Sequence, residues 1–150
     1  MAEGRGDRVE PGGSAEGKWK PPFEALDFLY MPSKDVAADL AFYEDRLGAR
    51  VVFAIEAIGT RVAEVQLSAG GPRLILAGHL DGEAPVLLHR VKSLETTLKD
   101  LDKAEVEVEA RFEIPQGPVC TLKTPGGQRL GLYELTRPEV DRGFRGRRDF

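Results

Sequence analysis

A seven-residue stretch that occurs twice decides the fold: GGPRLIL at residues 70–76 and GGQRLGL at residues 126–132. The two copies share five of seven residues and begin 56 positions apart. Similarity at a fixed spacing indicates a duplicated structural unit. We therefore expect the 150-residue chain to contain two halves of the same design.

The pattern of apolar residues divides the first half into a strand, a helix and three further strands. Residues 26–31 form an apolar run of strand length that Pro32 ends. Ser33 or Asp35 can then cap a helix that Gly48 ends. The apolar face of this helix comprises Val36, Leu40, Tyr43 and Leu47. Segments rich in β-branched residues follow at 50–58, 61–68 and 73–79.

The second half repeats this order. Residues 86–91 read as a strand, and Ser93 caps a helix. One face of that helix carries Leu94, Leu98 and Leu101. The remaining strands are expected at 105–114, 119–123 and 129–135. In the first of them, the alternation EVEVE at 105–109 indicates that one face is wet or lines a polar site.

The expected elements determine a fold class. Two helices cannot cover both faces of eight strands, so a curved sheet with the helices outside is the simplest arrangement. We predict an α+β fold in which two tandem modules, about residues 24–80 and 84–135, form a curved eight-stranded mixed sheet around a cleft. A concave surface of this kind is where small ligands bind.

Charge is distributed unevenly along the chain, whose formal net charge is −4. Residues 1–22 are rich in glycine, proline and balanced charge, and we expect them to be a disordered leader. Residues 137–150 hold five arginines and three acidic residues, which predicts a solvated basic tail. The single domain between them, residues 23–136, has a net charge of −6, which argues against a nucleic-acid-binding surface.

Neither a membrane span nor a disulfide is expected. The longest apolar run, residues 51–55, is far shorter than the roughly 18 residues that a membrane span needs, and the N-terminus has charges where a signal peptide would be apolar. The single cysteine, Cys120, excludes an internal disulfide and a cysteine-built metal site. Its place in the strand pattern predicts a buried, inert thiol. We expect a cytoplasmic protein with no membrane partner.

Two motifs resemble the vicinal oxygen chelate superfamily, which includes glyoxalase I, bleomycin-resistance proteins and extradiol dioxygenases. Residues 35–48 are similar to its helix signature, and TPGGQRLGLYE at residues 124–134 is similar to its closing turn and last strand. The match covers about residues 24–135. It implies paired βαβββ modules whose eight strands form a cleft, often completed in a homodimer. The chain departs from the pattern at Ala104, where a glycine usually ends the second helix.

The resemblance also bears on metal binding. Metal-dependent members of the superfamily place four ligands, usually His or Glu, on the first and last strands of each module. The corresponding positions here are Phe28, Ile75, Val86 and Gly131. None of these side chains can ligate a divalent ion. We therefore expect no bound metal and no cofactor, and neither glyoxalase I chemistry nor extradiol ring cleavage.

Alternation along the strands predicts which side chains face the cleft. Glu64 and Gln66 are expected to orient a ligand, and Glu64 is a candidate general base if its surroundings raise its pKa. The alternative is that Glu64 pairs with Arg61 or Arg73. The complete predicted ligand-binding set is Phe28, Tyr30, Glu64, Gln66, Ile75, Val86, Leu88, Thr121, Gly131 and Tyr133.

Three hypotheses about function follow. The first is a metal-free homodimer that binds an organic small molecule in an aromatic-lined cleft, as bleomycin-resistance proteins do. The second is a metal-dependent lyase, isomerase or dioxygenase of the same superfamily whose displaced ligands come from His79, His89, Glu64 and Glu134. For the two histidines, the pattern otherwise predicts an exposed His79 and a His89 that faces the helix. The third is a structural or regulatory subunit whose own side chains, such as Trp19, fill the cleft.

Overall fold

The computed structural model describes residues 18–57 and 59–150. None of the helices in these residues is long and apolar enough to cross a membrane. The π-helix η1 (Phe42–Arg46) directly continues the helix α2 (Val36–Ala41). The elements in chain order are β1 (Ala25–Pro32), α2 (Val36–Ala41), η1 (Phe42–Arg46), β2 (Arg50–Ala57), β3 (Thr60–Gln66), β4 (Arg73–Ala77), β5 (Val86–Val91), α3 (Leu94–Lys103), β6 (Ala110–Ile114), β7 (Gly117–Lys123), β8 (Arg129–Glu134) and α4 (Glu139–Phe144).

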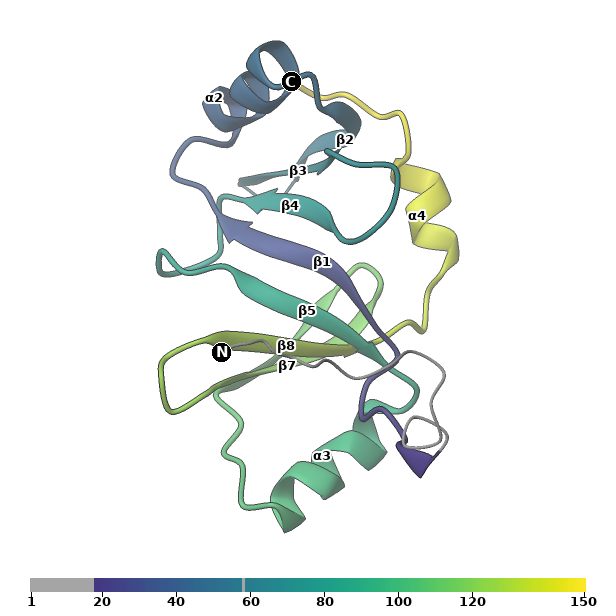
Figure 1. The fold of residues 1–150 in the computed structure, drawn as a ribbon. Coiled ribbons are helices and arrows are strands. Elements are labelled where there is room, and N and C mark those ends of the chain that lie inside the picture. Colours follow the sequence, from purple (N-terminus) through teal and green to yellow (C-terminus); the bar gives the residue numbers. More distant parts are fainter. Residues whose placement is uncertain (1–17, 58) are drawn as a thin grey trace, which may run out of the picture.

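The eight strands form one sheet in the order β2-β3-β4-β1-β5-β8-β7-β6. Within each module the first and last strands are parallel, β1 with β4 and β5 with β8, and the other neighbours are antiparallel. The modules meet at the pair β1–β5, where Phe28 lies opposite Leu88. Figure 1 shows the curved sheet with α2 and α3 near its opposite ends. The predicted α+β fold of two βαβββ modules is confirmed.

Apolar side chains form separate clusters on the two faces of the sheet. Val36 and Leu40 of α2 pack against one face of the first module, and Leu94 of α3 packs against the same face of the second. The opposite, inner face carries a cluster that spans both modules: Phe28, Tyr30, Ile75, Ala77, Val86, Leu88, Ile114, Val119 and Tyr133. Neither module could bury this inner cluster alone, so the seam between the modules belongs to the core.

The first helix departs from its predicted face at its C-terminal end. Asp35 caps the helix, because its carboxylate accepts a 3.0 Å hydrogen bond from Ala38 N. The last turn is a π-turn, closed by a 3.3 Å bond from Leu47 N to Phe42 O. This wider turn rotates Leu47 out of the apolar face, and Leu47 is 53% exposed. The prediction that Leu47 belongs to the apolar face of this helix was therefore wrong.

Residues 105–109 do not form the strand that their alternation predicts. The strand begins at Ala110, and the preceding valines, Val106 and Val108, pack against the cluster beneath α3. Glu105 lies in the left-handed region, and Val106 N donates to Leu101 O at 2.9 Å, which closes the helix. The stretch therefore wraps around the end of α3, with its valines inward and its glutamates outward.

Glu105 ends α3 in a conformation that is unfavourable for a residue with a side chain. Its φ of 60° brings Cβ close to the backbone, whereas the first helix has Gly48 at φ 75°. We expect Glu105→Gly to raise the free energy of unfolding by about 0.5–1 kcal/mol, as measured by urea denaturation. The control Glu107→Gly, in the extended stretch, should not stabilise the protein. Unchanged or lower stability of Glu105→Gly would contradict this account.

The C-terminal residues are mostly exposed, as their charge predicts, but they are held against the sheet rather than forming a free tail. Residues 139–144 form α4, and residues 146–149 run along the outer edge of β2, where Ala54 makes backbone hydrogen bonds of 2.8 and 2.6 Å to them. Phe144 packs on Phe53 with ring centroids 5.4 Å apart. Figure 1 shows this yellow segment passing from α4 to the neighbourhood of α2. Counting charges overlooked the aromatic side chains that anchor it.

The predicted disordered leader lies mostly outside the described residues. Its described part, residues 18–22, is exposed, and Trp19 is 62% exposed. The third hypothesis suggested that Trp19 fills the cleft, and this exposed position shows that it does not.

Candidate functional site

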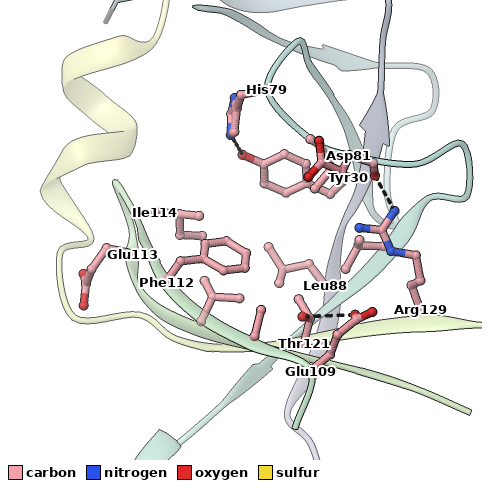
Figure 2. A pocket seen from close by; sticks show the side chains of 14 residues that line it. Tyr30, His79, Asp81, Leu88, Glu109, Phe112, Glu113, Ile114, Thr121 and Arg129 are labelled. Atoms are coloured by element: carbon pink, nitrogen blue, oxygen red, sulfur yellow. Dashed lines mark hydrogen bonds between the residues drawn. The ribbon is translucent and has the colours of Figure 1, made fainter.

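Two adjoining pockets open on the inner face of the sheet, and both have Tyr30, His79, Glu113 and Ile114 in their walls. The larger lies over the second module and has a volume of about 510 Å³; the smaller lies over the first and has about 270 Å³. A cavity of the larger size suits a small organic molecule. Figure 2 shows the larger pocket, which is also lined by Leu80, Asp81, Val86, Leu88, Glu109, Ala110, Phe112, Val119, Thr121 and Arg129.

Apolar side chains from three strands form the floor of the larger pocket. Val86 and Leu88 come from β5, Val119 from β7 and Phe112 from β6. Gly131 of β8 makes this floor possible, because a Cβ there would lie 2.7 Å from Leu88 Cδ1 and 2.9 Å from Val86 Cγ1. Without that Cβ, both β5 side chains can lie over β8. The glycine of the second repeat therefore helps to shape the pocket.

Tyr30 and His79 meet at the boundary of the two pockets. The Tyr30 hydroxyl lies 3.4 Å from His79 Nε2, and His79 Nδ1 lies 3.4 Å from Thr60 Oγ1. Burial raises the pKa of Tyr30 to about 12, so its hydroxyl is neutral at physiological pH and can donate a hydrogen bond. Figure 2 shows the two rings together on one side of the pocket.

Charged groups surround the mouth of the larger pocket. Arg129 Nη1 donates to the backbone oxygens of Asp81 and Ala84, both at 2.8 Å, which fixes the guanidinium in place. Figure 2 shows another nitrogen of this guanidinium turned toward the pocket. Glu109, which also lines this pocket, lies 3.5 Å from Thr121 Oγ1 and 3.2 Å from Lys123 Nζ. The rim thus offers both donors and acceptors beside an apolar floor.

The structure brings together part of the predicted cleft set. The larger pocket is lined by Tyr30, Val86, Leu88 and Thr121. Ile75 lines the smaller pocket. Phe28 and Tyr133 are buried on the inner face but line neither pocket. The Tyr133 hydroxyl donates to Asp27 Oδ2 at 2.5 Å, and burial, helped by this hydrogen bond, raises the pKa of Tyr133.

Glu64 and Gln66 do not reach either pocket. Glu64 is fully buried, and its Oε2 accepts a 2.9 Å hydrogen bond from Arg73 Nη1, so the alternative of a pair with Arg73 applies. Burial raises the pKa of the Glu64 carboxyl, and the hydrogen bond from Arg73 opposes that effect. Arg61 pairs with Glu56 instead. Gln66 donates to Ser68 O at 3.0 Å.

The inner face does not suit a metal ion. Asp27, at the bulge of β1, has its carboxylate engaged by Tyr133 and Arg90. Apart from Asp27 and arginines near the strand ends, the four central strands direct these side chains inward: Phe28, Tyr30, Ile75, Ala77, Val86, Leu88, Gly131 and Tyr133. None is a carboxylate, imidazole or thiolate, which are the usual donors. The raised pKa values of Tyr30 and Tyr133 keep both phenols protonated. Within residues 18–57 and 59–150, no three His, Cys, Asp or Glu side chains gather as a metal site requires.

The displaced ligands of the second hypothesis do not converge. His89 lies on the opposite face, with its ring 5.2 Å from that of Phe23. Glu134 Oε1 accepts a 2.9 Å hydrogen bond from Leu94 N at the start of α3. Of the four candidates, His79 lines both pockets, and the other three line neither.

Cys120 matches its sequence-based description. It is fully buried in the cluster beneath α3. Burial raises the pKa of its thiol, which keeps the sulfur protonated and unreactive.

The predicted cleft set omitted most of the residues that line the larger pocket, among them His79, Arg129 and Phe112. His79 is exposed, as expected, but it lies at the pocket mouth. Arg129 is two residues from Gly131 on the same strand, so the alternation that placed Gly131 inward also placed Arg129 there. Phe112 could have been found in the same way on β6. None of the three occupies a position that the superfamily resemblance suggests for the cleft, so the predicted cleft set did not include them.

Comparison with known proteins supports the fold. The sequence matches no family profile and no curated protein. The structure is similar to methylmalonyl-CoA epimerase from Mycobacterium tuberculosis, with 20% identity, a TM-score of 0.63, and 79% of this chain and 91% of that chain covered. A hypothetical protein from Bacillus halodurans has 17% identity, a TM-score of 0.63, and coverage of 75% and 94%.

A third similar structure is a variant of Streptomyces coelicolor methylmalonyl-CoA epimerase in complex with 2-nitronate-propionyl-CoA. It has 16% identity, a TM-score of 0.60, and coverage of 77% of this chain and 99% of that chain. At these identities the likeness establishes the fold alone, and the fold of paired βαβββ modules is the one that the sequence resemblance implied.

Proposed function

We propose that this protein binds an organic small molecule in the larger inner-face pocket and does so without a bound metal. The observation that carries this proposal is the apolar inner face of the four central strands, together with the 510 Å³ pocket beside it. Such a face excludes water and contributes binding free energy through apolar burial. Similar structures include an epimerase with a bound CoA derivative, so a cleft of this fold can hold an organic ligand.

The lining of the pocket indicates the chemistry of the ligand. Val86, Leu88 and Phe112 suit an apolar or planar body. The Tyr30 hydroxyl and the fixed Arg129 guanidinium lie where they can bind a polar group on that body. The homodimer and the cytoplasmic location both remain predictions from the sequence.

The metal-free part of the proposal predicts that divalent ions have no effect on stability. We expect elemental analysis of the purified protein to find less than one equivalent of Zn, Ni, Mn, Co or Fe. The unfolding temperature should not change with EDTA or with added metal, because an ion that does not bind the native state cannot stabilise it. One equivalent of metal, lost on chelation together with several degrees of thermal stability, would refute this part.

The ligand-binding part can be tested with the fluorescent probe 8-anilinonaphthalene-1-sulfonate. Its apolar rings and single charge match the lining of the pocket, and its fluorescence should rise on binding. Ala110 lines the larger pocket on an exposed edge strand, so Ala110→Trp should fill the space and weaken binding about tenfold, or 1.4 kcal/mol. The control Ala69→Trp changes an exposed turn and should bind like the original protein.

A cooperative unfolding transition in each variant is required, because this probe also binds partly unfolded chains. Equal binding by Ala110→Trp and Ala69→Trp would show that the probe does not occupy this pocket.

A further inference from the structure

The inner face of the first module corresponds, position by position, to the floor of the larger pocket. The repeated heptapeptide makes Ile75 of β4 equivalent to Gly131 of β8. Glu64 of β3 lies opposite Ile75, and Thr121 of β7 lies opposite Gly131. Thr121 lines the larger pocket, so Glu64 occupies the equivalent position in the first module. The duplication therefore built two equivalent concave surfaces.

The helix α4 covers the surface on the first module. Phe53 lies opposite Glu64, as Ala110 lies opposite Thr121. Phe144 of α4 packs on Phe53 with ring centroids 5.4 Å apart. The smaller pocket has Phe144 in its wall, so it is the part of this surface that the ring leaves open. An aromatic side chain of the protein itself thus takes a place where the second module has open space.

Beneath this cover, Glu64 lacks a hydrogen-bond partner that it needs. Its side chain is fully buried, and Arg73 contacts only Oε2, at 2.9 Å. The other oxygen, Oε1, has no partner in the described part of the chain. A buried carboxylate oxygen without a donor costs free energy, and such groups are rare in folded proteins. The unpaired oxygen therefore suits a hydrogen-bond donor brought by a ligand.

The helix α4, which covers this surface, is itself only weakly attached. The helix α4 has six residues, contains Gly143, has no side-chain cap at Pro138 and buries none of its residues. A helix this short is marginal by itself. Phe144 attaches the helix itself to β2. The chain beyond the helix is held more firmly, by the backbone bonds of residues 146–149, by Glu56 N donating to Asp149 Oδ2 at 2.9 Å, and by Phe150, which packs against the cluster beneath α2. Segments with few buried contacts open at low free-energy cost while the rest of the protein stays folded.

We propose that the inner face of the first module is a second ligand site, which Phe144 occupies until an aromatic molecule with a hydrogen-bond donor displaces it. The ring of the ligand replaces the Phe144 ring on Phe53, and its donor binds Glu64 Oε1. This site adjoins the larger pocket, because Tyr30, His79, Glu113 and Ile114 line both pockets, but it does not depend on the function proposed for the larger pocket.

Indole and 1-methylindole form a matched pair of probes for this site. They differ in the N–H donor, and titration calorimetry measures both. We expect Phe144→Ala to bind indole roughly tenfold more tightly than the original protein, because no competing ring remains. In this variant 1-methylindole should bind several-fold more weakly than indole. Adding Glu64→Leu should remove the difference between the two probes. Equal affinity for indole in the original protein and Phe144→Ala would overturn the proposal.

The variant Ala110→Trp distinguishes the second site from the larger pocket. This substitution blocks the larger pocket, and it should leave indole binding in the Phe144→Ala background unchanged. Loss of indole binding in the double variant would place the probe in the larger pocket and refute a second site.

Hydrogen exchange tests displacement in the unmodified chain. The amides of Ala54, Gly146 and Asp149 bond across the β2 edge, so they should exchange at least tenfold faster than core amides of β3 and β4. Exchange of both groups only on global unfolding would show that the cover does not open.

Discussion

Gly117→Ala is expected to lower the free energy of unfolding by about 4 kcal/mol or to prevent folding. Gly117 has a φ of 156°, and a Cβ there would overlap the backbone oxygen of Glu134. The overlap cannot relax easily, because Thr136 N and Arg137 N both donate to Gln116 O at 3.0 Å and hold the β6–β7 turn against the end of β8. Urea denaturation measures the loss.

Gly126→Ala is the matched control for this prediction. Gly126 lies in the other turn of the same module, and a Cβ there would meet nothing within 4 Å. We expect that variant to stay within about 0.5 kcal/mol of the original protein. If both variants unfolded at the same urea concentration, our account of a close approach between Gly117 and Glu134 would be wrong.

Arg73→Met is expected to lower the free energy of unfolding by about 3 kcal/mol at pH 7. The substitution keeps much of the side-chain volume but leaves the Glu64 carboxylate buried without its partner. Glu64→Gln in the same chain should recover most of the loss, because the neutral amide is far less costly to bury. Lys99→Met, which breaks a pair exposed to solvent, should change stability by less than about 0.5 kcal/mol.

The effect of Arg73→Met should depend on pH in a defined direction. Burial raises the pKa of Glu64 above its usual value of 4.5, so the folded state holds this proton more tightly than the unfolded state. The stability that this difference contributes is complete below the usual pKa and is lost as the pH rises through the folded pKa. The loss caused by Arg73→Met should therefore be smaller at pH 4 than at pH 7. An equal loss at both pH values would mean that Glu64 stays neutral.

Much of the fold could be predicted because the relevant signals are local or repeated. The strand at 86–91 coincides with β5, and the duplicated heptapeptide places β4 and β8 in equivalent positions. The π-turn that exposes Leu47 could not be predicted, because a spacing of i, i+4, i+7 and i+11 assumes a regular helix. Phe144 packs on Phe53, which lies 91 residues earlier in the chain, and no local sequence pattern records such a contact.

For the candidate site, the sequence predicted which face of the sheet a side chain lies on. It did not predict whether that side chain is buried or lines a pocket. Alternation correctly assigned Tyr30, Thr121 and Glu64 to the inner face. It could not tell that Thr121 lines an open pocket while Glu64 is buried beneath α4. The difference arises because the C-terminal segment covers the inner face of the first module, whereas the charge of that segment predicted a solvated tail.

The hydrogen bonds between residues 146–149 and β2 also limit how the molecule can associate with itself. A sheet has two outer strands, here β2 and β6, and an unpaired outer strand is a template for adding a strand from another molecule. The chain's own end occupies the β2 side. Strand addition is then confined to β6. A molecule with one unpaired sheet edge can pair with one other molecule by strand addition, but it cannot extend into a fibre by that route.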